Sequence, residues 1–305
     1  MKRSIALATL LVSFSSIALG QQLDPVTTWA TIAASEFRVH PNIVYGHANN
    51  VDLRLDVVTV DKSNQPRPTV IYIHGGGWVG GTKEGTELEV LPYLAHGMNA
   101  VNVEYRLASV SLAPAAVEDC RCALRWVYDH AQEYGFDTNK LVVAGGSAGG
   151  HLSLMTGMLT ASAGFDNQCP GKISGGKTAE MKVAAIVDYY GITDVADVLQ
   201  GPNARSWALT WLDSLPNRME LAKQLSPLTY VRKDLPPIII LHGDSDPTVP
   251  YPQGVRLHEA LDAAGVSNEL VTIPGGGHGG WPREQNLRAQ EAIFHFLTTH
   301  GILSQ

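Results

Sequence analysis

Short apolar runs rich in valine and isoleucine recur along the chain, and glycine, proline or polar residues bound each of them. Runs of this length and composition are typical of strands buried in a parallel sheet. We predict such strands at residues 69–73, 100–103, 141–144, 183–187, 238–241 and 270–273. Residues 51–60 alternate apolar with polar side chains instead, which predicts a half-buried strand near a sheet edge.

Stretches with helical periodicity lie between or after these strands. We predict helices at residues 115–134, 148–159, 253–264 and 284–297. Strands that alternate with helices predict an α/β fold of one domain, with a mostly parallel twisted sheet covered by helices on both faces. Residues 192–234 depart from this alternation, and their prolines and tryptophans, among them Trp207 and Trp211, predict a small cap above the sheet.

Composition narrows the class of protein. With 45% hydrophobic and 17% charged residues, the 305-residue chain fits a packed globular protein rather than a disordered one. A nucleic-acid-binding surface needs clustered Lys and Arg, whereas this chain has a net charge of −7 and no sizeable basic run. We therefore expect no nucleic-acid partner.

Residues 1–20 have the pattern of a secretory signal peptide. Lys2 and Arg3 precede a short apolar stretch, and small residues follow it at positions that suit cleavage before Gln21. The apolar stretch is shorter than the roughly 20 residues that a spanning helix needs, which favours cleavage over an uncleaved anchor. Removal of the two basic residues would change the net charge from −7 to −9. We expect residues 21–305 to be secreted or periplasmic, without stable membrane insertion.

An oxidising compartment would favour a disulfide among the three cysteines. Cys120 and Cys122 lie two residues apart on a predicted helix and point to nearly opposite faces, so they are poorly placed to bridge each other. Cys120 shares an apolar face with its helical neighbours, and we therefore favour Cys122 as the partner of Cys169, with three free thiols as the alternative. The cysteines and histidines lack zinc-site spacing, so we predict no metal.

A candidate nucleophile follows the strand predicted at residues 141–144. There Gly-Gly-Ser-Ala-Gly-Gly contains G-x-S-x-G between a predicted strand and a predicted helix. Glycines on both sides permit the sharp turn that exposes a nucleophilic serine, here Ser147. The turn also places the amide of Ala148 at a helix N-terminus, where the helix dipole favours developing negative charge.

A glycine-rich loop, His-Gly-Gly-Gly-Trp, follows the strand predicted at residues 69–73. Backbone amides already aimed at a developing oxyanion stabilise the tetrahedral intermediate of acyl transfer, and consecutive glycines leave such amides uncovered. We assign Gly76 and Gly77 as oxyanion-hole donors beside Ala148. We interpret His74 as a hydrogen-bonded orienter of this loop rather than as a catalytic base.

Two later strand ends carry a carboxylate and an imidazole. A serine nucleophile needs a base, and the base needs a carboxylate that holds its tautomer. We choose Asp246 as this carboxylate, with Asp244 as the alternative, because Asp244 is also suited to bond its own turn. His278, in a second glycine-rich loop near the C-terminus, is the predicted general base.

These segments together resemble the α/β-hydrolase superfamily, whose triad follows the chain order Ser147, Asp246, His278. From about residue 51 to residue 296, the chain is similar to the secreted esterases related to hormone-sensitive lipase and to the bifunctional acetylxylan and feruloyl esterases. The resemblance implies a carboxylic ester hydrolase with no metal or organic cofactor. Gly146 departs from the acidic residue usual in the hormone-sensitive-lipase branch, and the H-G-x-x-D-x-x-V-P context of the acid is more like the feruloyl-esterase branch.

Three further functions compete with ester hydrolysis. Gly75, Gly77 and Gly80 also match G-x-G-x-x-G after a strand, and Glu104 ends the next strand, as in dinucleotide sites. Bulky Trp78 inside the turn argues against such a site. The same fold could also belong to a serine peptidase of the prolyl-oligopeptidase type, or to a binding protein without catalytic activity.

The sequence defines the substrate only as a class. We expect a small-molecule or polysaccharide-linked ester with a short-chain acyl, acetyl or feruloyl group. Trp78 and Trp281 flank the predicted oxyanion loop and base, which predicts that they wall an acyl or aromatic pocket. The alternative for these two, and for Trp207 and Trp211, is simple packing.

Overall fold

The computed structural model describes residues 24–60, 65–170, 181–213 and 215–304. The chain divides into two compact units between Ser35 and Glu36. The described part of the first unit lies in helix α1 (Pro25–Glu36), in which no side chain is buried. The predicted signal peptide lies outside the described residues. Within the ranges given above, no helix is long and apolar enough to cross a membrane.

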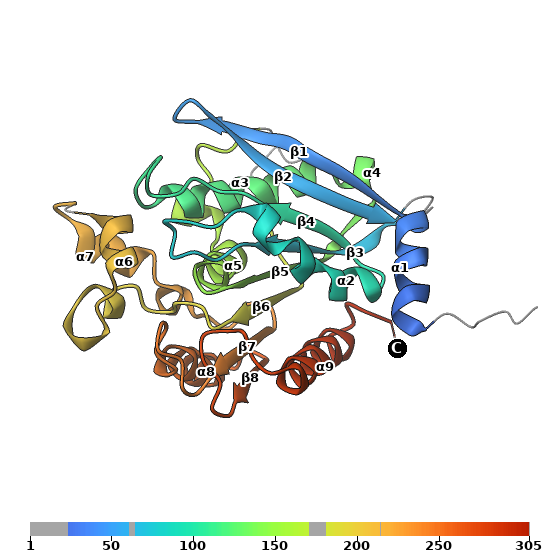
Figure 1. Ribbon diagram of the computed structural model, residues 1–305. Helices are drawn as coiled ribbons and strands as arrows, with labels where there is room; N and C mark the ends of the chain where they lie inside the picture. The colour runs from blue at the N-terminus through green and yellow to red at the C-terminus, as the bar shows by residue number, and fades with distance from the viewer. Residues whose placement is uncertain (1–23, 61–64, 171–180, 214, 305) are drawn as a thin grey trace, which may run out of the picture. The chain divides into compact units, whose positions relative to one another are not determined.

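Among the described residues of the second unit, eight strands form one sheet, in the order β1-β2-β4-β3-β5-β6-β7-β8 (Figure 1). The strands are β1 Phe37–Ala48, β2 Val51–Val60, β3 Arg67–Ile73, β4 Asn99–Val103, β5 Phe136–Gly146, β6 Ala185–Tyr189, β7 Ile238–Gly243 and β8 Asn268–Ile273. Neighbours from β4 to β8 are parallel, whereas β2 pairs antiparallel with both β1 and β4. The mostly parallel sheet predicted from the sequence is therefore confirmed, and it aligns the carboxyl ends of the parallel strands along one edge.

Helices cover both faces of the sheet. Besides α1, the described α-helices outside the cap are α2 Leu91–Ala95, α3 Ala115–Asp129, α4 Ala131–Tyr134, α5 Ala148–Met158, α8 Pro252–Ala264 and α9 Arg283–Thr299; two 3-10 helices are η1 Lys83–Val90 and η2 Ala161–Ala163. Ile71 and Val143 belong to the apolar cluster that includes α3, α5 and α8, whereas their neighbours Val70 and Val142 belong to the cluster that includes α2 and α9. Both faces are thus buried, which explains the continuous apolar runs.

The sequence pattern misses strand β1. Pro41 and Gly46 interrupt its alternation, and the ladder with β2 shifts register beside both residues. An edge strand tolerates such interruptions because only one of its sides is paired. The helix predicted at residues 115–134 is broken at His130, whose φ of −108° and ψ of 13° are not helical.

Residues 192–234, here called the cap, contain five short helices in the part that the structure describes. These are η3 Asp197–Leu199, η4 Gly201–Asn203, α6 Ser206–Leu212, α7 Arg218–Gln224 and η5 Pro227–Tyr230. Figure 1 shows α6 and α7 beyond the carboxyl ends of the parallel strands. Trp211 in the cap stacks on Trp78, with ring centroids 4.1 Å apart. The cap is therefore joined to the glycine-rich loop after β3.

His151 of α5 makes a second connection to the cap. Its Nδ1 accepts a hydrogen bond from Trp78 Nε1 (3.2 Å), and its Nε2 donates to the Leu225 carbonyl (2.7 Å). Burial lowers the pKa of His151 to about 4, although the bond to Leu225 acts in the opposite direction. The imidazole is therefore neutral at pH 7.

A disulfide joins Cys122 of α3 to Cys169, with Cα atoms 4.9 Å apart, and Cys120 is buried and free. This is the pairing that the sequence favours. Next to it, fully buried Arg121 donates from Nε and Nη2 to the two oxygens of Asp166 (2.7 and 2.6 Å). The disulfide and the ion pair both fasten the segment after α5 to helix α3.

The Asp166→Ala substitution should be strongly destabilising, because it leaves the Arg121 guanidinium buried without a counter-charge. Such a change costs about 3–5 kcal/mol of the free energy of unfolding, measurable by urea denaturation with the disulfide intact. Glu284→Ala, which removes one partner of the exposed pair between Glu284 and Arg288, is the control and should have little effect. Equal effects of the two substitutions would contradict the role given to Asp166.

Candidate active site

Ser147 stands at the turn between β5 and α5. Its backbone has φ 59° and ψ −121°, a conformation that is strained for a residue with a side chain. The turn also requires glycine on both sides. A Cβ on Gly145 would lie 2.4 Å from the carbonyl oxygen of Ile73, and one on Gly149 would lie 2.1 Å from the same atom. The G-x-S-x-G motif therefore lets the end of β3 approach the turn that exposes Ser147.

The loop after β3 presents free amides near this turn. Within the described residues, the amides of Gly76, Gly77 and Ala148 donate no hydrogen bond. Gly76 and Gly77 have φ of 112° and 60°, in the region that glycine adopts most readily. A Cβ on Gly76 would lie 2.0 Å from the Gly80 carbonyl oxygen. The loop therefore needs glycine, and its free amides are available to a developing oxyanion.

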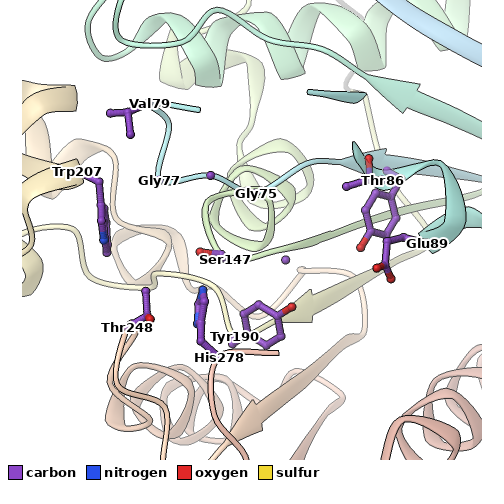
Figure 2. Close-up of a pocket in the computed structure, with 13 residues that line it drawn as sticks. Gly75, Gly77, Val79, Thr86, Glu89, Ser147, Tyr190, Trp207, Thr248 and His278 are labelled. Carbon is purple, nitrogen blue, oxygen red and sulfur yellow. The ribbon is translucent and has the colours of Figure 1, made fainter. Parts of the chain in front are cut away.

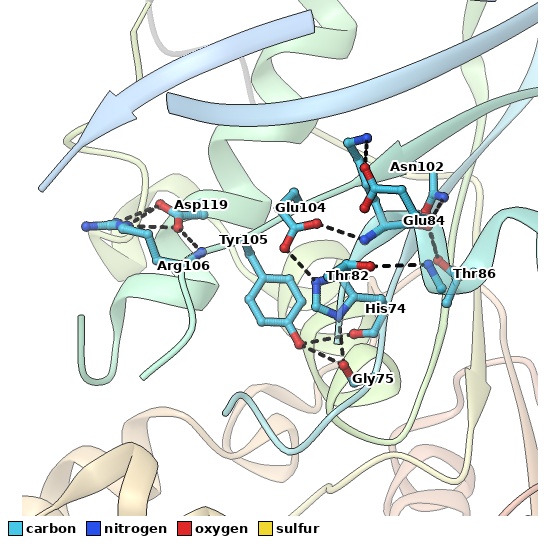
Figure 3. A network of polar contacts seen from close by, with 12 residues as sticks. His74, Gly75, Thr82, Glu84, Thr86, Asn102, Glu104, Tyr105, Arg106 and Asp119 are labelled. Carbon is cyan, nitrogen blue, oxygen red and sulfur yellow. Dashed lines mark hydrogen bonds and ion pairs between the residues drawn. The ribbon is translucent and has the colours of Figure 1, made fainter. Parts of the chain in front are cut away.

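His74 is buried behind this loop (Figure 3). Its Nδ1 donates to the Gly75 carbonyl (2.7 Å), and its ring stacks on Tyr105 with centroids 4.2 Å apart. Its Nε2 lies 3.5 Å from Glu104 Oε1, while Glu104 also accepts from the Lys83 amide (2.8 Å). These contacts fit the predicted orienting role of His74. The same contacts occupy the Glu104 carboxylate, which a dinucleotide site would need for the ribose of its ligand.

An imidazole and a carboxylate meet at the ends of β7 and β8. His278 Nδ1 donates to Asp246 Oδ2 (2.7 Å), and Asp246 Oδ1 accepts from the amides of Thr248 (2.7 Å) and Val249 (3.0 Å). Asp244 instead accepts from a backbone amide of the glycine-rich loop after β8 (2.7 Å). The structure thus brings His278 together with Asp246 and leaves Asp244 in the turn.

A second imidazole supports the same carboxylate. His242 is fully buried, and its Nε2 lies 3.0 Å from the Val249 carbonyl oxygen and 3.5 Å from Asp246 Oδ2. Burial alone would raise the pKa of Asp246, but hydrogen bonds from His242 and His278 outweigh it and hold this pKa well below its usual range. Asp246 is therefore ionised at neutral pH. No sequence motif indicates this role of His242.

A pocket of about 430 Å³ opens at these loops, and both Ser147 and His278 line it (Figure 2). No hydrogen bond joins the two side chains in the described part of the chain, so proton transfer requires that they move closer together. Catalytic contacts are often long without substrate and shorten in its complex. Among the residues that the structure describes, no group of three or more His, Cys, Asp or Glu could hold a metal ion.

Tyr190 also lines the pocket, and the sequence pattern does not reveal it. It follows β6 with a φ of 42°, and its ring centroid lies 4.6 Å from that of His278. Burial raises the pKa of Tyr190, so the phenol stays protonated at neutral pH. No glycine-rich motif accompanies Tyr190. The only signal for it in the sequence is its position directly after a predicted parallel strand.

The prediction that Trp78 and Trp281 wall the pocket is wrong, because both rings are covered by aromatic neighbours. Trp78 is fully buried, stacked on Trp211 and tilted against Trp207 at a centroid distance of 5.3 Å. Trp281 is 6% exposed and packs edge-on against Tyr190 at 5.5 Å. Trp207 from the cap lines the pocket instead.

Asp188, at the end of β6, should make stability depend on pH. Burial raises its pKa to about 7 from 3.8, although His242 opposes the shift. The native state therefore holds this proton more tightly than the unfolded chain, and the stabilisation is complete below pH 3.8 and is lost as the pH rises through about 7. Asp188→Asn keeps an acceptor for the Gly191 amide (2.9 Å) and should raise Tm increasingly from pH 4 to pH 8.

The control for this titration is Asp213→Asn at an exposed position, which should show no comparable gain. The measurement is thermal unfolding of the three proteins across the pH range. An Asp188→Asn effect that is the same at pH 4 and pH 8 would show that burial of the charge is not its cause.

Comparisons with known proteins place these residues in a family. The chain matches the BD-FAE family model over residues 55–261, more than half of its length. It is 31% identical over 227 residues to the esterase LipC of Mycobacterium tuberculosis, covering 72% of this chain and 54% of LipC. It is 32% identical over 258 residues to the carboxylesterase NlhH of the same organism, covering 80% and 76%. The chain spans about half the length of LipC and of the next two curated relatives.

Solved structures of Est2, a thermophilic esterase of the planctomycete Thermogutta terrifontis, share the fold. With butyrate bound, Est2 superposes with a TM-score of 0.72 at 30% identity, over 86% of this chain and 95% of Est2. Phosphorylated by paraoxon, it gives a TM-score of 0.69 at 28% identity, over 88% and 96%. The eight-stranded sheet, the serine turn after β5 and the family match together show that this chain belongs to the BD-FAE family of α/β-hydrolases.

Proposed function

We propose that the protein is a carboxylic ester hydrolase that acts through an acyl-enzyme on Ser147. The observation that carries this proposal is the 2.7 Å contact between His278 Nδ1 and Asp246 Oδ2, beside a pocket that Ser147 also lines. A carboxylate in this position fixes the tautomer that leaves a lone pair on Nε2, which a serine nucleophile needs. LipC, NlhH and Est2 are named esterases, which supports an ester as substrate.

In the proposed reaction, His278 Nε2 takes the proton of Ser147 as Oγ attacks the ester carbonyl carbon. The former carbonyl oxygen becomes negative and accepts hydrogen bonds from the amides of Gly76, Gly77 and Ala148. The imidazolium then protonates the leaving alcohol as the carbon–oxygen bond breaks, and the acyl group stays on Oγ. Water then attacks the acyl carbon as the same imidazole takes its proton. The imidazolium returns a proton to Oγ as the bond between Oγ and the acyl carbon breaks, which releases the acid and restores Ser147.

The size of the pocket supports short acyl groups. Its volume is about 430 Å³, and Trp207, which lines it, packs so close to the oxyanion loop that a Cβ on Gly77 would lie 2.8 Å from Trp207 Cβ. The butyrate bound to Est2 supports the same size class. We propose short-chain, acetyl or feruloyl esters, free or linked to a polysaccharide, as substrates of an exported enzyme.

Ser147→Ala should lower kcat for p-nitrophenyl butyrate about 10⁴-fold or more, because it removes the nucleophile. Paraoxon should add one diethylphosphoryl group to the wild type, on the peptide that contains Ser147, and none to the variant, as read by mass spectrometry. Removing His278 as well should cost little more, since the two residues act as a unit. Full activity in Ser147→Ala would refute the mechanism, and faster cleavage of peptide p-nitroanilides than of esters would point to a peptidase.

The two aspartates offer a matched pair of the same substitution. Asp246→Asn should lower kcat by about 10³–10⁴-fold, because an amide favours the wrong imidazole tautomer. Asp244→Asn should retain most activity, because its carboxylate bonds only the turn and the neighbouring loop. The assignment of the acid fails if the larger loss of kcat occurs in Asp244→Asn.

A further inference from the structure

The pocket has two unlike sides. Figure 2 shows Val79 and Trp207 on one side of Ser147 and Thr86 and Glu89 on the other. The first side offers aliphatic and aromatic surface, whereas the second carries a hydroxyl and a carboxylate from helix η1. Because the proposed hydrolysis uses neither of these polar groups, the second side is available to recognise another part of the substrate.

Tyr72 of β3 adds a third polar group to the second side, because it lies opposite Asn102, whose Oδ1 accepts from Thr86. Tyr72 lines the pocket and is only 5% exposed, yet its hydroxyl makes no hydrogen bond within the described residues. The hydroxyl oxygen is not sealed inside the protein, so a ligand group in the pocket can reach it. Burial raises the pKa of Tyr72, so the group stays an O–H donor at neutral pH.

Glu89 supplies an acceptor without a counter-charge. In the described part of the chain its carboxylate makes no hydrogen bond or ion pair, and no Lys or Arg is among the residues that line the pocket. Although Glu89 is exposed at the rim, nearby protein groups displace part of its hydration, which raises its pKa. An ionised carboxylate at this point favours a ligand that donates hydrogen bonds.

Thr86 is an acceptor as well. Its Oγ1 lies 3.0 Å from the Lys83 carbonyl oxygen and 3.1 Å from Asn102 Oδ1, both of which can take its hydrogen. A hydroxyl has one hydrogen and two lone pairs, so the lone pairs of Thr86 remain for a ligand. Together these side chains offer one O–H donor, from Tyr72, and two acceptors.

We propose that Tyr72, Thr86 and Glu89 form a subsite for a neutral, polyhydroxylated group of the ester substrate. A hydroxyl can donate to Glu89 or Thr86 and accept from Tyr72, whereas an ammonium group can only donate. The inference rests on the proposed ester hydrolysis and adds a preference for esters that carry adjacent hydroxyls. Those hydroxyls can belong to the alcohol or to the acid.

Two pairs of esters separate these sources. On the alcohol side, 2,3-dihydroxypropyl acetate is compared with propyl acetate, and on the acyl side, ethyl 2,3-dihydroxypropanoate with ethyl propanoate. In one pair the wild type should prefer the hydroxylated ester by about tenfold or more in kcat/KM. The ester without hydroxyls leaves the polar groups of the subsite without hydrogen-bond partners. That pair identifies which part of the substrate the subsite binds.

Tyr72→Phe and Glu89→Gln should each lower this ratio by roughly 3- to 30-fold, because each removes one hydrogen bond or the charge that strengthens it. Tyr93→Phe and Glu87→Gln are the matched controls and should leave the ratio unchanged. Tyr93 belongs to the same apolar cluster as Tyr72, and Glu87 to the same helix as Glu89, but neither lines the pocket. Glu89→Gln alters no buried packing, so it carries the test if Tyr72→Phe does not fold.

Three results would overturn the subsite. The first is equal hydrolysis of both members of each pair by the wild type, and the second is an equal loss for both members in the variants. The third is a preference for 2-(trimethylammonio)ethyl acetate over 3,3-dimethylbutyl acetate that depends on Glu89 but not on Tyr72, which would indicate a cation site. Failure of paraoxon to label Ser147, with no hydrolysis of any ester, would refute the proposed function and the subsite together.

Discussion

The close approach of two strand ends governs the rest of this structure. The carbonyl oxygen of Ile73, the last residue of β3, occupies the space that a side chain on Gly145 or Gly149 would fill. The parallel register sets Ile73 opposite Gly145, so the sheet itself brings the oxyanion loop beside the serine turn. The strained backbone of Ser147 persists because its amide is bonded to the Tyr189 carbonyl (2.8 Å) and helix α5 begins directly after it.

The oxyanion loop is fixed from both of its ends. At one end His74 bonds the Gly75 carbonyl and stacks on Tyr105. At the other end Trp78, whose φ of 61° is unfavourable for a bulky residue, stacks on Trp211 and donates to His151. The geometry of the loop therefore depends on the cap as well as on the sheet. Trp207 adds to this dependence, because this cap residue contacts Trp78 and also lines the pocket.

Sequence patterns predicted the elements whose local signal matches their tertiary role. The buried parallel strands appear as apolar runs because both sheet faces are covered, and Ser147 is found because only glycine fits beside it. The sequence did not predict strand β1, because Pro41 and Gly46 interrupt its alternation and an edge strand tolerates such residues. The sequence did not reveal Tyr190, because no motif surrounds it and its place in the pocket depends on its contact with His278 after β8. Trp78 lies beside a motif, but the sequence could not show whether it faces the pocket or the core. Its burial depends on Trp211 of the cap, while Trp207 of the cap lines the pocket.

His151 links acidity to the geometry of the oxyanion loop. Its two ring nitrogens already serve one donor and one acceptor, so a second proton would displace the Trp78 N–H. Its pKa is lowered to about 4 from 6.5, so the stabilisation is complete above pH 6.5 and is lost progressively as the pH falls through about 4. Protonation of His151 would then loosen the cap and the oxyanion loop together. A histidine that does not line the pocket thus limits the stability of this fold in acid.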